Sequence, residues 1–316
     1  MEREYRSYRR ASGFKMVSFE RMVDLVTAVI VFLYEAGVGY IMSVVDAVAK
    51  RPKSMVGKTV VITGGASGIG KEVAQMFANI GAKIALLDMN EDLNKQTANE
   101  INENAGLAIP FTADVTKPEQ MREVALRIQK HPNLGDPHLV VCNAGVMSLN
   151  SMLDQSENDI RRTVEVNLLG YFWTIRAFLP RMLEKNEGHI AAISSIAGYF
   201  GNTDMSAYSA SKFGVRGIME SLEWEVYDAG KDGIKLTTIY PYFTYTPLLN
   251  GVVVKSRLFQ PLTVEKTAQV IVDSILLEKN EAYTSTLISL WCNALKATAP
   301  QRVKVAFKHL VAVSAR

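Results

Sequence analysis

Tyr208 and Lys212 are the residues whose types and spacing most directly indicate chemistry. They lie four positions apart in Tyr208-Ser209-Ala210-Ser211-Lys212, and Ser195 precedes Tyr208 by thirteen residues. Residues four apart share one face of a helix, and a neighbouring ammonium group favours the phenolate of a phenol whose free pKa is about 10. Standing alone, the pair would read as an exposed Tyr and Lys on one helix. Because it follows a glycine run, it indicates hydride transfer at a nicotinamide cofactor.

That glycine run is Thr63-Gly64-Gly65-Ala66-Ser67-Gly68-Ile69-Gly70, placed after an apolar run and before a helical pattern. Residues without a Cβ let the backbone approach a pyrophosphate, whose charge is met by free N–H groups and the helix dipole. The spacing differs from the common dinucleotide pattern Gly-x-Gly-x-x-Gly. A turn that needs glycine only for packing is the alternative. We predict cofactor contacts from Gly64, Ser67, Gly68, Ile69 and Gly70.

Asp88 ends the second expected strand, eighteen residues after Gly70. A carboxylate at that place accepts hydrogen bonds from both hydroxyls of the adenosine ribose. A 2′-phosphate would meet a like charge there, and neither the glycine turn nor Met89-Asn90 supplies a compensating Arg or Lys. The sequence therefore favours NAD, with NADP as the less favoured cofactor. The alternative role for Asp88 is that of an ordinary helix N-cap.

Composition excludes several classes of protein. The chain of 316 residues is 48% hydrophobic, which is enough for a large core. With 35 basic and 32 acidic residues its net charge is +3, without the excess expected of a nucleic-acid partner. Two cysteines and the absence of any Asn-x-Ser/Thr acceptor favour a reducing compartment, most simply the cytosol. The 4 histidines have no ligand spacing, so we predict no metal site.

The N-terminal region reads as a basic tail over 1–15 and a hydrophobic membrane-anchor segment over 16–53. Its apolar part has the length that spans a bilayer core, roughly 20 residues. Glu35 opposes this, because an ionised acid near mid-membrane costs on the order of 2 to 3 kcal/mol. An anchor that spans the membrane or lies in one leaflet is favoured over a cleaved signal peptide or a packed core or dimer helix. Basic residues flank both ends, so they give no orientation.

From 54 to 316 short apolar runs alternate with longer amphipathic stretches, which predicts one α/β domain. Strands that are apolar throughout and alternate with helices are typical of a doubly wound, Rossmann-type parallel sheet with helices on both faces. The expected strands are Thr59–Thr63, Lys83–Asp88, Ala108–Thr112, Leu139–Asn143, His189–Ser194 and Ile234–Tyr240. The expected helices include Gly70–Ile80, Asp92–Glu103, Pro118–Lys130, Glu157–Leu183 and Ala207–Ala229.

The C-terminal stretch contains no Asp or Glu after Glu281 but several Lys and Arg. Val303, Phe307, Leu310 and Val311 fall at helical spacing on one face. We expect a basic amphipathic helix here. It either lies on an anionic membrane surface or packs its apolar side on the domain.

Over 56–285 the chain resembles the short-chain dehydrogenase/reductase family. The motifs that carry the resemblance are the glycine run, Asp114-Val115, Asn143-Ala144-Gly145, Asn167, Ser195 and Tyr208-x-x-x-Lys212. The hydrophobic N-terminal segment, the Arg51-Pro52-Lys53 junction and the segment from Asn167 to Thr174 are most similar to the membrane-associated branch. That branch includes retinol dehydrogenases and the 17β-hydroxysteroid dehydrogenases of lipid droplets.

The resemblance implies roles for four catalytic residues. Tyr208 would be the general acid/base, and Ser195 would hydrogen-bond the substrate oxygen, so both contact substrate. Lys212 would support Tyr208 and hold the nicotinamide ribose. Asn167 would organise a water that links Lys212 to solvent.

The resemblance also implies further cofactor contacts. Asp114 and Val115 would line the adenine pocket, and Thr246 would bind the nicotinamide carboxamide. The residues that would pack beneath the cofactor are Asn143, Ala144 and Gly145. The family commonly has Gly where this chain has Tyr242, so the path of the loop to Thr246 departs from the family pattern.

Two local alternatives remain open in the sequence. Ser194 could replace Ser195 as the oxygen-binding residue, although the interval to Tyr208 favours Ser195. The aromatic group Tyr240, Tyr242, Phe243 and Tyr245 follows the sixth strand, where it forms either core or the wall of a lipid-binding pocket.

Together these features predict an NAD-dependent enzyme that interconverts an apolar alcohol, such as a retinoid, a steroid or another lipid, and its carbonyl. We expect it at the endoplasmic reticulum membrane or a lipid droplet, with its catalytic domain facing the cytosol and a homodimer as an option. A membrane or droplet scaffold with little catalysis and a soluble NADP-dependent carbonyl reductase are the alternatives.

Overall fold

The computed structural model describes residues 19–104, 106–249, 260–285, 300 and 302–303. The expected basic tail, 1–15, lies outside the described residues, as do Phe307, Leu310 and Val311 of the expected C-terminal helix. Contacts divide the chain into two units, Met1–Arg51 and Pro52–Arg316.

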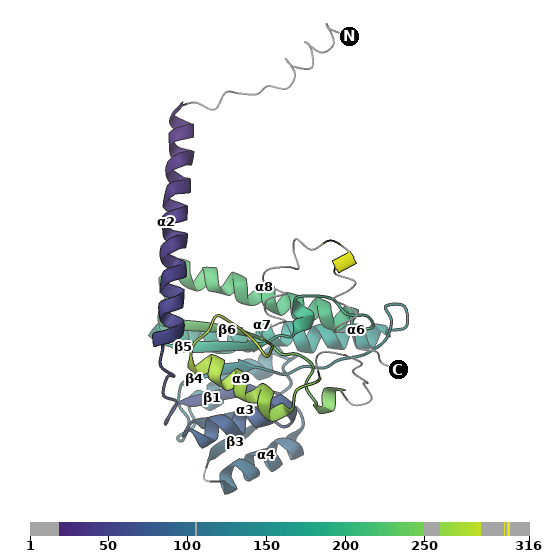
Figure 1. The fold of residues 1–316 in the computed structure, drawn as a ribbon. Helices are drawn as coiled ribbons and strands as arrows, with labels where there is room; N and C mark the ends of the chain where they lie inside the picture. Colours follow the sequence, from purple (N-terminus) through teal and green to yellow (C-terminus); the bar gives the residue numbers. More distant parts are fainter. Residues whose placement is uncertain (1–18, 105, 250–259, 286–299, 301, 304–316) are drawn as a thin grey trace. The chain divides into compact units, whose positions relative to one another are not determined.

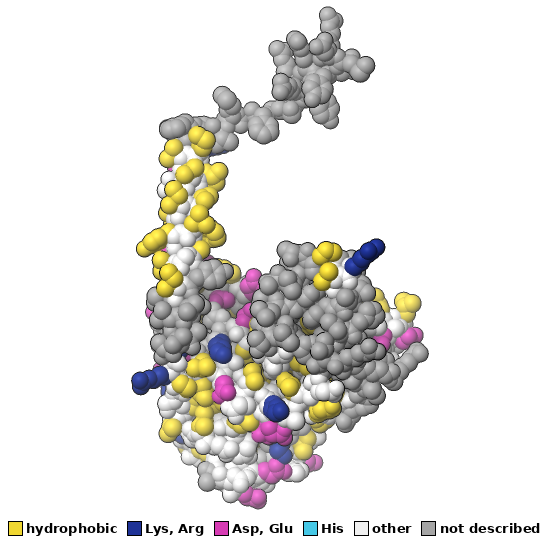
Figure 2. All heavy atoms as spheres, in the orientation of Figure 1, with side chains coloured by type: hydrophobic (Ala, Val, Ile, Leu, Met, Phe, Trp, Pro, Cys, Tyr) yellow, Lys and Arg dark blue, Asp and Glu magenta, His cyan; other side chains and the backbone are white. Residues whose placement is uncertain are grey.

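The first unit contains the helix α2 (Phe19–Ala49). Its stretch Arg21–Gly39 has a mean hydropathy of 1.8 and no buried residue, and it is the one described helix long and apolar enough to cross a membrane. Nineteen residues extend about 28 Å at the rise of an α-helix. Figure 2 shows hydrophobic side chains along this helix, and those of Phe32 and Tyr34 are each 68% exposed.

The second unit is built on a sheet of seven parallel strands in the order β3-β2-β1-β4-β5-β6-β7 (Figure 1). The central strand β1 pairs with β2 on one side and β4 on the other, so that Val61 lies beside both Ala85 and Val140. The strands are β1 (Thr59–Thr63), β2 (Lys83–Asp88), β3 (Leu107–Thr112), β4 (Pro137–Cys142), β5 (Gly188–Ile193), β6 (Ile234–Tyr240) and β7 (Glu281–Tyr283).

Alternate side chains of each strand point to opposite faces of the sheet. In β1, Val60 and Ile62 join the core beneath α3 (Gly68–Asn79), α4 (Glu91–Glu103) and α9 (Val264–Leu276). Val61 points the other way, into the core beneath α5 (Pro118–Gln129), α7 (Gly170–Lys185) and α8 (Ser206–Asp228). Burial on both faces explains why β1 is apolar along its length and confirms the doubly wound fold (Figure 1).

All six expected strands form within two residues of their expected ends. The structure differs at Glu157–Leu183, which is not one continuous helix but α6 (Glu157–Val164), a π-helical turn (Glu165–Leu169) and α7. The widened turn carries Asn167, whose side chain bonds the backbone N–H and C=O of Val146, each at 2.8 Å. The average helical period over this long stretch changes little when one turn contains an extra residue, so periodicity alone did not reveal the widened turn. The sequence analysis also missed α9 and the three-residue edge strand β7.

Candidate active site

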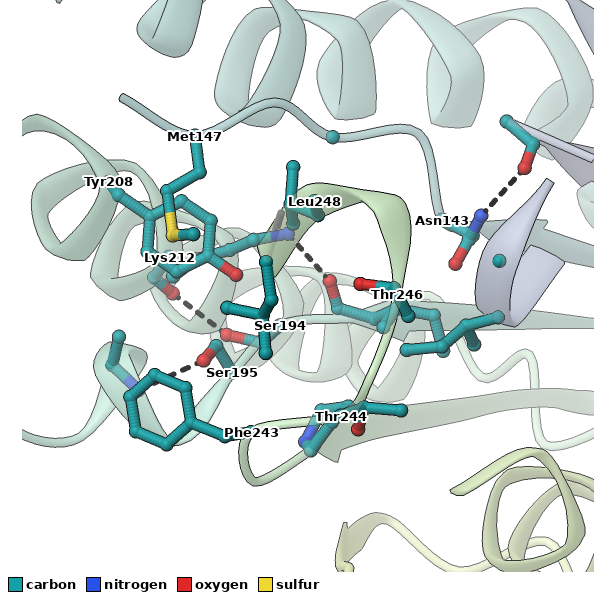
Figure 3. Close-up of a pocket in the computed structure, with 18 of the residues that line it drawn as sticks. Asn143, Met147, Ser194, Ser195, Tyr208, Lys212, Phe243, Thr244, Thr246 and Leu248 are labelled. Carbon is teal, nitrogen blue, oxygen red and sulfur yellow. Dashed lines mark hydrogen bonds between the residues drawn. The ribbon is translucent and has the colours of Figure 1, made fainter. Parts of the chain in front are cut away.

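The carboxyl ends of the parallel strands meet at one edge of the sheet, where they surround a cavity of about 420 Å³. This is the edge at which ligands bind in doubly wound sheets, beside the point where the strand order reverses between β1 and β4. Figure 3 shows Asn143, Ser195, Tyr208, Lys212 and Thr246 around the cavity. The cavity thus brings together expected site residues from separate parts of the chain, which are the glycine turn, the ends of β2, β4 and β5, the helix α8 and the loop after β6.

The glycine turn between β1 and α3 is shaped by positions that exclude a side chain. Gly64 and Gly68 have φ values of +64° and +54°, which strain residues with a Cβ. At Gly70 the obstacle is steric, because a Cβ would lie 2.1 Å from the carbonyl oxygen of Gly64. The glycines therefore serve packing and also leave the start of α3 open toward the cavity.

Asn143 and Ala144 lie directly against this turn. The Asn143 amide donates to the carbonyl oxygens of Thr63 and Gly64, both at 3.0 Å. The Thr63 hydroxyl accepts from the N–H groups of Asn143 and Ala144 at 3.0 and 3.1 Å. A Cβ on Gly64 would lie only 2.8 Å from Ala144 Cα, so these segments approach as closely as their backbones allow.

A second cavity, of about 320 Å³, shares Gly64, Asp88, Ala144 and Gly145 with the first. It is lined by Asp114, Val115 and Arg162 among others. Two adjoining cavities bridged by a glycine turn at a helix N-terminus could hold a dinucleotide, and the expected adenine contacts of Asp114 and Val115 stay a prediction. At Ser67, the N-cap of α3, the side chain makes no capping hydrogen bond.

Asp88 lies at the border of the two cavities. Its carboxylate oxygens accept from the N–H groups of Ala66 at 3.2 Å and Asn90 at 3.0 Å, which fixes the carboxylate beside the glycine turn. The N-cap of α4 is Asn90, so the capping role considered for Asp88 is wrong. Lys71, the first cation after the turn, is paired with Glu100 of α4.

The two adjacent serines have different environments. Ser194 is buried, and its hydroxyl donates to the carbonyl oxygen of Lys212 at 3.0 Å. Ser195 is half-buried in the cavity wall, accepts from the Ala197 N–H at 3.1 Å and is hydrogen-bonded to Tyr208. The geometry therefore favours Ser195 as the serine available to a substrate oxygen.

Tyr208 and Lys212 lie one turn apart on α8, and both line the cavity. The Lys212 side chain is only 3% exposed, and its Nζ donates to the Ile193 carbonyl oxygen at 2.8 Å and to the Tyr171 hydroxyl at 3.3 Å. Nζ also lies 5.8 Å from the centre of the Tyr208 ring. Burial disfavours the ammonium form and lowers the pKa of Lys212 to about 7.

Burial acts on Tyr208 in the opposite direction. It raises the pKa of the Tyr208 phenol above its ordinary value, and the hydrogen bond with Ser195 offsets this only in part. The sequence analysis expected the Lys212 ammonium to lower the pKa of the Tyr208 phenol. Burial opposes this in two ways, because it disfavours the ammonium form of Lys212 and the phenolate form of Tyr208. At neutral pH the Tyr208 phenol is thus protonated, while the Lys212 amine can gain or lose a proton.

Asn167 is completely buried beside this pair. Its Nδ2 also donates to the Ser211 hydroxyl at 3.2 Å, so the widened turn joins the loop after β4 to α8. A Cβ placed on Gly145 would lie 3.5 Å from Asn167 Oδ1 and 3.8 Å from Lys212 Nζ. Asn167 therefore packs directly behind the catalytic candidates, while its role in a water relay stays a prediction.

The loop after β6 reaches the cavity despite Tyr242. This residue adopts no positive φ, its side chain is buried, and its N–H donates to the Thr284 hydroxyl at 2.8 Å. Thr246 still lies against the glycine turn, since a Cβ on Gly68 would be 3.6 Å from its Cγ2. Of the aromatic group, Tyr240, Tyr242 and Phe243 pack in one buried cluster, and Tyr242 and Phe243 also line the cavity. Tyr245 is exposed.

Several cavity residues were missed in the sequence. Apolar side chains from the loops after β4, β5 and β6 complete the wall, namely Met147, Met205, Leu248 and Leu249. Loop residues follow no helical or strand period, so only their proximity to expected site residues could have indicated them.

Comparisons with known proteins agree with this architecture. Residues 58–256 match the family described as short chain dehydrogenase. Short-chain dehydrogenase/reductase family 16C member 6 of Bos taurus is 38% identical over 234 residues, covering 73% of each chain. Epidermal retinol dehydrogenase 2 of Mus musculus is 32% identical, covering 83% of this chain and 85% of that protein.

Two further similarities extend the comparison. Estradiol 17-beta-dehydrogenase 11 of Mus musculus is 31% identical, covering 84% of this chain and 88% of that protein. The crystal structure of a short chain dehydrogenase/reductase from Burkholderia phymatum in complex with NAD matches with a TM-score of 0.68 and 25% identity. That match covers 75% of this chain and 92% of the other.

We expect direct titration to show a neutral Lys212 amine above about pH 7. Only an unprotonated amine reacts with acetic anhydride, and this small reagent can enter the cavity that Lys212 lines. Mass spectrometry of the full chain labelled across the pH range should place half-maximal labelling of Lys212 at about 7. Lys95, whose pKa is raised by Glu91 on the surface of α4, is the internal control. Coincident midpoints for the two lysines would contradict the effect of burial.

Proposed function

Because the chain belongs to the short chain dehydrogenase family, we propose that it is an NAD-dependent enzyme that interconverts an apolar alcohol and its carbonyl. The family and the branch expected from the motifs are confirmed by the matched residues and by the retinol and estradiol dehydrogenases among the relatives. The observation that carries the proposal is the convergence of Ser195, Tyr208 and Lys212 with the glycine turn in one cavity.

The proposed chemistry assigns one task to each side chain. A bound nicotinamide would supply the hydride acceptor for oxidation or the hydride donor for reduction. The Ser195 hydroxyl binds the substrate oxygen, and Tyr208 takes the proton of an alcohol or gives one to a carbonyl. Lys212 shares the proton of the pair with Tyr208 and holds the nicotinamide ribose. Asn167 organises the water through which Lys212 exchanges protons with solvent.

The apolar part of the cavity supports a lipophilic substrate. Met147, Met205, Phe243 and Leu248 face the same space as the Tyr208 hydroxyl. Methionine adapts to irregular apolar shapes, which suits a flexible lipid chain or a fused ring system. Because the names of two relatives specify retinol and estradiol, we propose a retinoid, a steroid or another lipid alcohol.

The surroundings of Asp88 support NAD. A ribose can donate its hydroxyl protons to a carboxylate, whereas a 2′-phosphate would be repelled by it. Lys71 already pairs with Glu100, and the residues directly after Asp88 are Met89 and Asn90, so neither the start of α3 nor the segment after β2 adds a second cation next to the carboxylate. The cations Lys117 and Arg162 line the second cavity on the side of Asp114 and Val115. A match to a structure in complex with NAD agrees with this choice.

The helix α2 supports attachment to a membrane, in which lipophilic substrates concentrate. Its apolar stretch has about the thickness of the hydrocarbon core. Glu35 lies four residues from the end of that stretch, about 6 Å from its boundary and not at its centre. We propose the endoplasmic reticulum membrane or a lipid droplet, with the catalytic domain in the cytosol.

Tyr208→Phe should lower NAD-linked oxidation by roughly 100- to 10,000-fold, because the acid/base group is lost while the ring remains. The measurement is NAD reduction by membrane fractions with all-trans-retinol, a 17β-hydroxysteroid or a long-chain alcohol. Tyr227→Phe removes a phenol hydroxyl from an exposed position of the same helix and should retain wild-type rates. Equal and negligible rates for wild type and Tyr208→Phe with every substrate would favour the scaffold alternative.

Asp88→Asn should raise the ratio of NADP to NAD kcat/KM by roughly tenfold or more. A like charge a few ångströms from the 2′-phosphate costs on the order of 1 to 4 kcal/mol, and the amide removes it while keeping an acceptor oxygen. Asp92→Asn, which makes the same change on the first turn of α4, should leave the ratio unchanged. An unaltered ratio in Asp88→Asn would refute the cofactor argument.

Carbonate extraction should leave the wild-type chain in the membrane pellet. Replacing Ile30 and Leu33 together by Lys places two charges within the apolar stretch, at roughly 2.5 to 3.5 kcal/mol each, and should shift the chain to the supernatant. Release of the wild-type chain by carbonate would remove the anchor proposal and favour a helix that packs in an assembly.

A further inference from the structure

Tyr171 is a buried phenol to which neither the motifs nor the proposed chemistry assigns a role. It lies on the first turn of α7, four residues after Asn167, and its side chain is 2% exposed. A phenol hydroxyl with no partner would be costly at this depth. The contacts of the Tyr171 hydroxyl therefore indicate what holds it there.

Those contacts form a triangle with Lys212. The Tyr171 hydroxyl donates to the Ile193 carbonyl oxygen at 2.8 Å. Lys212 Nζ donates both to that carbonyl oxygen, at 2.8 Å, and to the Tyr171 hydroxyl oxygen, at 3.3 Å. Because the phenol proton is directed to Ile193, a lone pair of the phenol oxygen is left for the amine.

The aromatic rings limit the position of the amine further. Nζ of Lys212 lies 5.1 Å from the centre of the Tyr171 ring and 5.8 Å from that of Tyr208. An ammonium group at such distances is attracted by the ring faces. The long lysine side chain would otherwise sample many rotamers, so these contacts together restrict it to one arrangement.

The triangle joins the three elements that carry the catalytic candidates. Ile193 is the last residue of β5 and precedes Ser194 and Ser195 in the chain. Lys212 lies on α8 with Tyr208, and Tyr171 follows the widened turn that contains Asn167. A displacement of any one element would thus change the hydrogen bonds of the Lys212 amine.

No negatively charged group near Lys212 among the described residues stabilises its ammonium form. The titratable groups that face it are Cys142 from β4, Tyr171 from α7 and Tyr208 from α8. Burial raises the pKa of each, that of Cys142 to about 12, so none of the three is negative at neutral pH. Among the described residues, the ammonium form is therefore stabilised by oxygen acceptors, which are the Ile193 carbonyl and the Tyr171 hydroxyl.

We propose that Tyr171 is a positioning residue that fixes the direction and favours the protonated form of the Lys212 amine through its hydroxyl oxygen. The proposal rests on the proposed function, in which Lys212 serves Tyr208 and the cofactor. It assigns to Tyr171 no contact with substrate.

The test is Tyr171→Phe in the full chain, which keeps the ring and removes the hydroxyl. Without this acceptor the ammonium form is less stable, so the midpoint of Lys212 labelling by acetic anhydride should fall by about one pH unit. Every protonation state of Tyr208 and Lys212 that contains the ammonium loses stability. The rise of kcat with pH should therefore also shift to lower pH. At its optimum, kcat should fall roughly 10- to 100-fold while KM for the alcohol changes by less than about twofold.

Thr174→Val is the matched control. Thr174 is a buried hydroxyl residue on the same helix, and it donates to the Gly170 carbonyl oxygen at 2.7 Å without contacting Lys212. This variant should retain the wild-type labelling midpoint and pH profile.

Two results would overturn the proposal. One is a Tyr171→Phe chain whose labelling midpoint equals that of Thr174→Val, even if its activity is lost, since that would leave Tyr171 a packing role only. The other is a kcat within about twofold of the control at every pH. A wild-type chain inactive on every alcohol would count against the proposed function, whereas a shifted midpoint would still support the Tyr171 contact with Lys212.

Discussion

The pairing of β1 with a parallel strand on each side is the constraint on which the site depends. Because β2 and β4 both run parallel to β1, the segments that follow these strands emerge at the same edge of the sheet. The chain passes on opposite sides of β1 to reach them, which opens a crevice above its carboxyl end. The glycine turn and Asn143 then meet above β1 at a separation that leaves no room for a Cβ on Gly64.

Burial of the Lys212 amine is the main electrostatic feature of this crevice. An amine withdrawn from water favours its neutral form, and its neighbours Cys142, Tyr171 and Tyr208 are neutral as well. The site therefore surrounds the amine with neutral groups and does not hold it in a permanent ion pair. With a pKa of about 7 the Lys212 amine can change its protonation near neutral pH, which suits a reaction that takes up or releases one proton.

The sheet and the loops contribute different parts of the cavity. The residues proposed to act on the proton, Ser195, Tyr208 and Lys212, lie after a strand end or on α8, whose positions are fixed by a core buried on both faces of the sheet. The apolar wall comes from connecting loops, through Met147, Met205 and Leu248. Loops can change length and composition without disturbing the sheet, so substrate choice can vary while the chemistry stays fixed.

The sequence alone determined the six apolar strands, the doubly wound arrangement and the motifs from Gly64 to Lys212, because burial on both faces of a parallel sheet leaves a continuous apolar run. It did not reveal the widened turn at Asn167, because one extra residue hardly changes the average period of a long helical stretch. It also did not reveal the edge strand β7, because three residues are too few to show a period. Only the tertiary structure decided that Asp88 braces the glycine turn instead of capping α4. It alone brought Tyr171 to Lys212, because hydrogen bonds between residues 41 positions apart depend on how α7 and α8 pack.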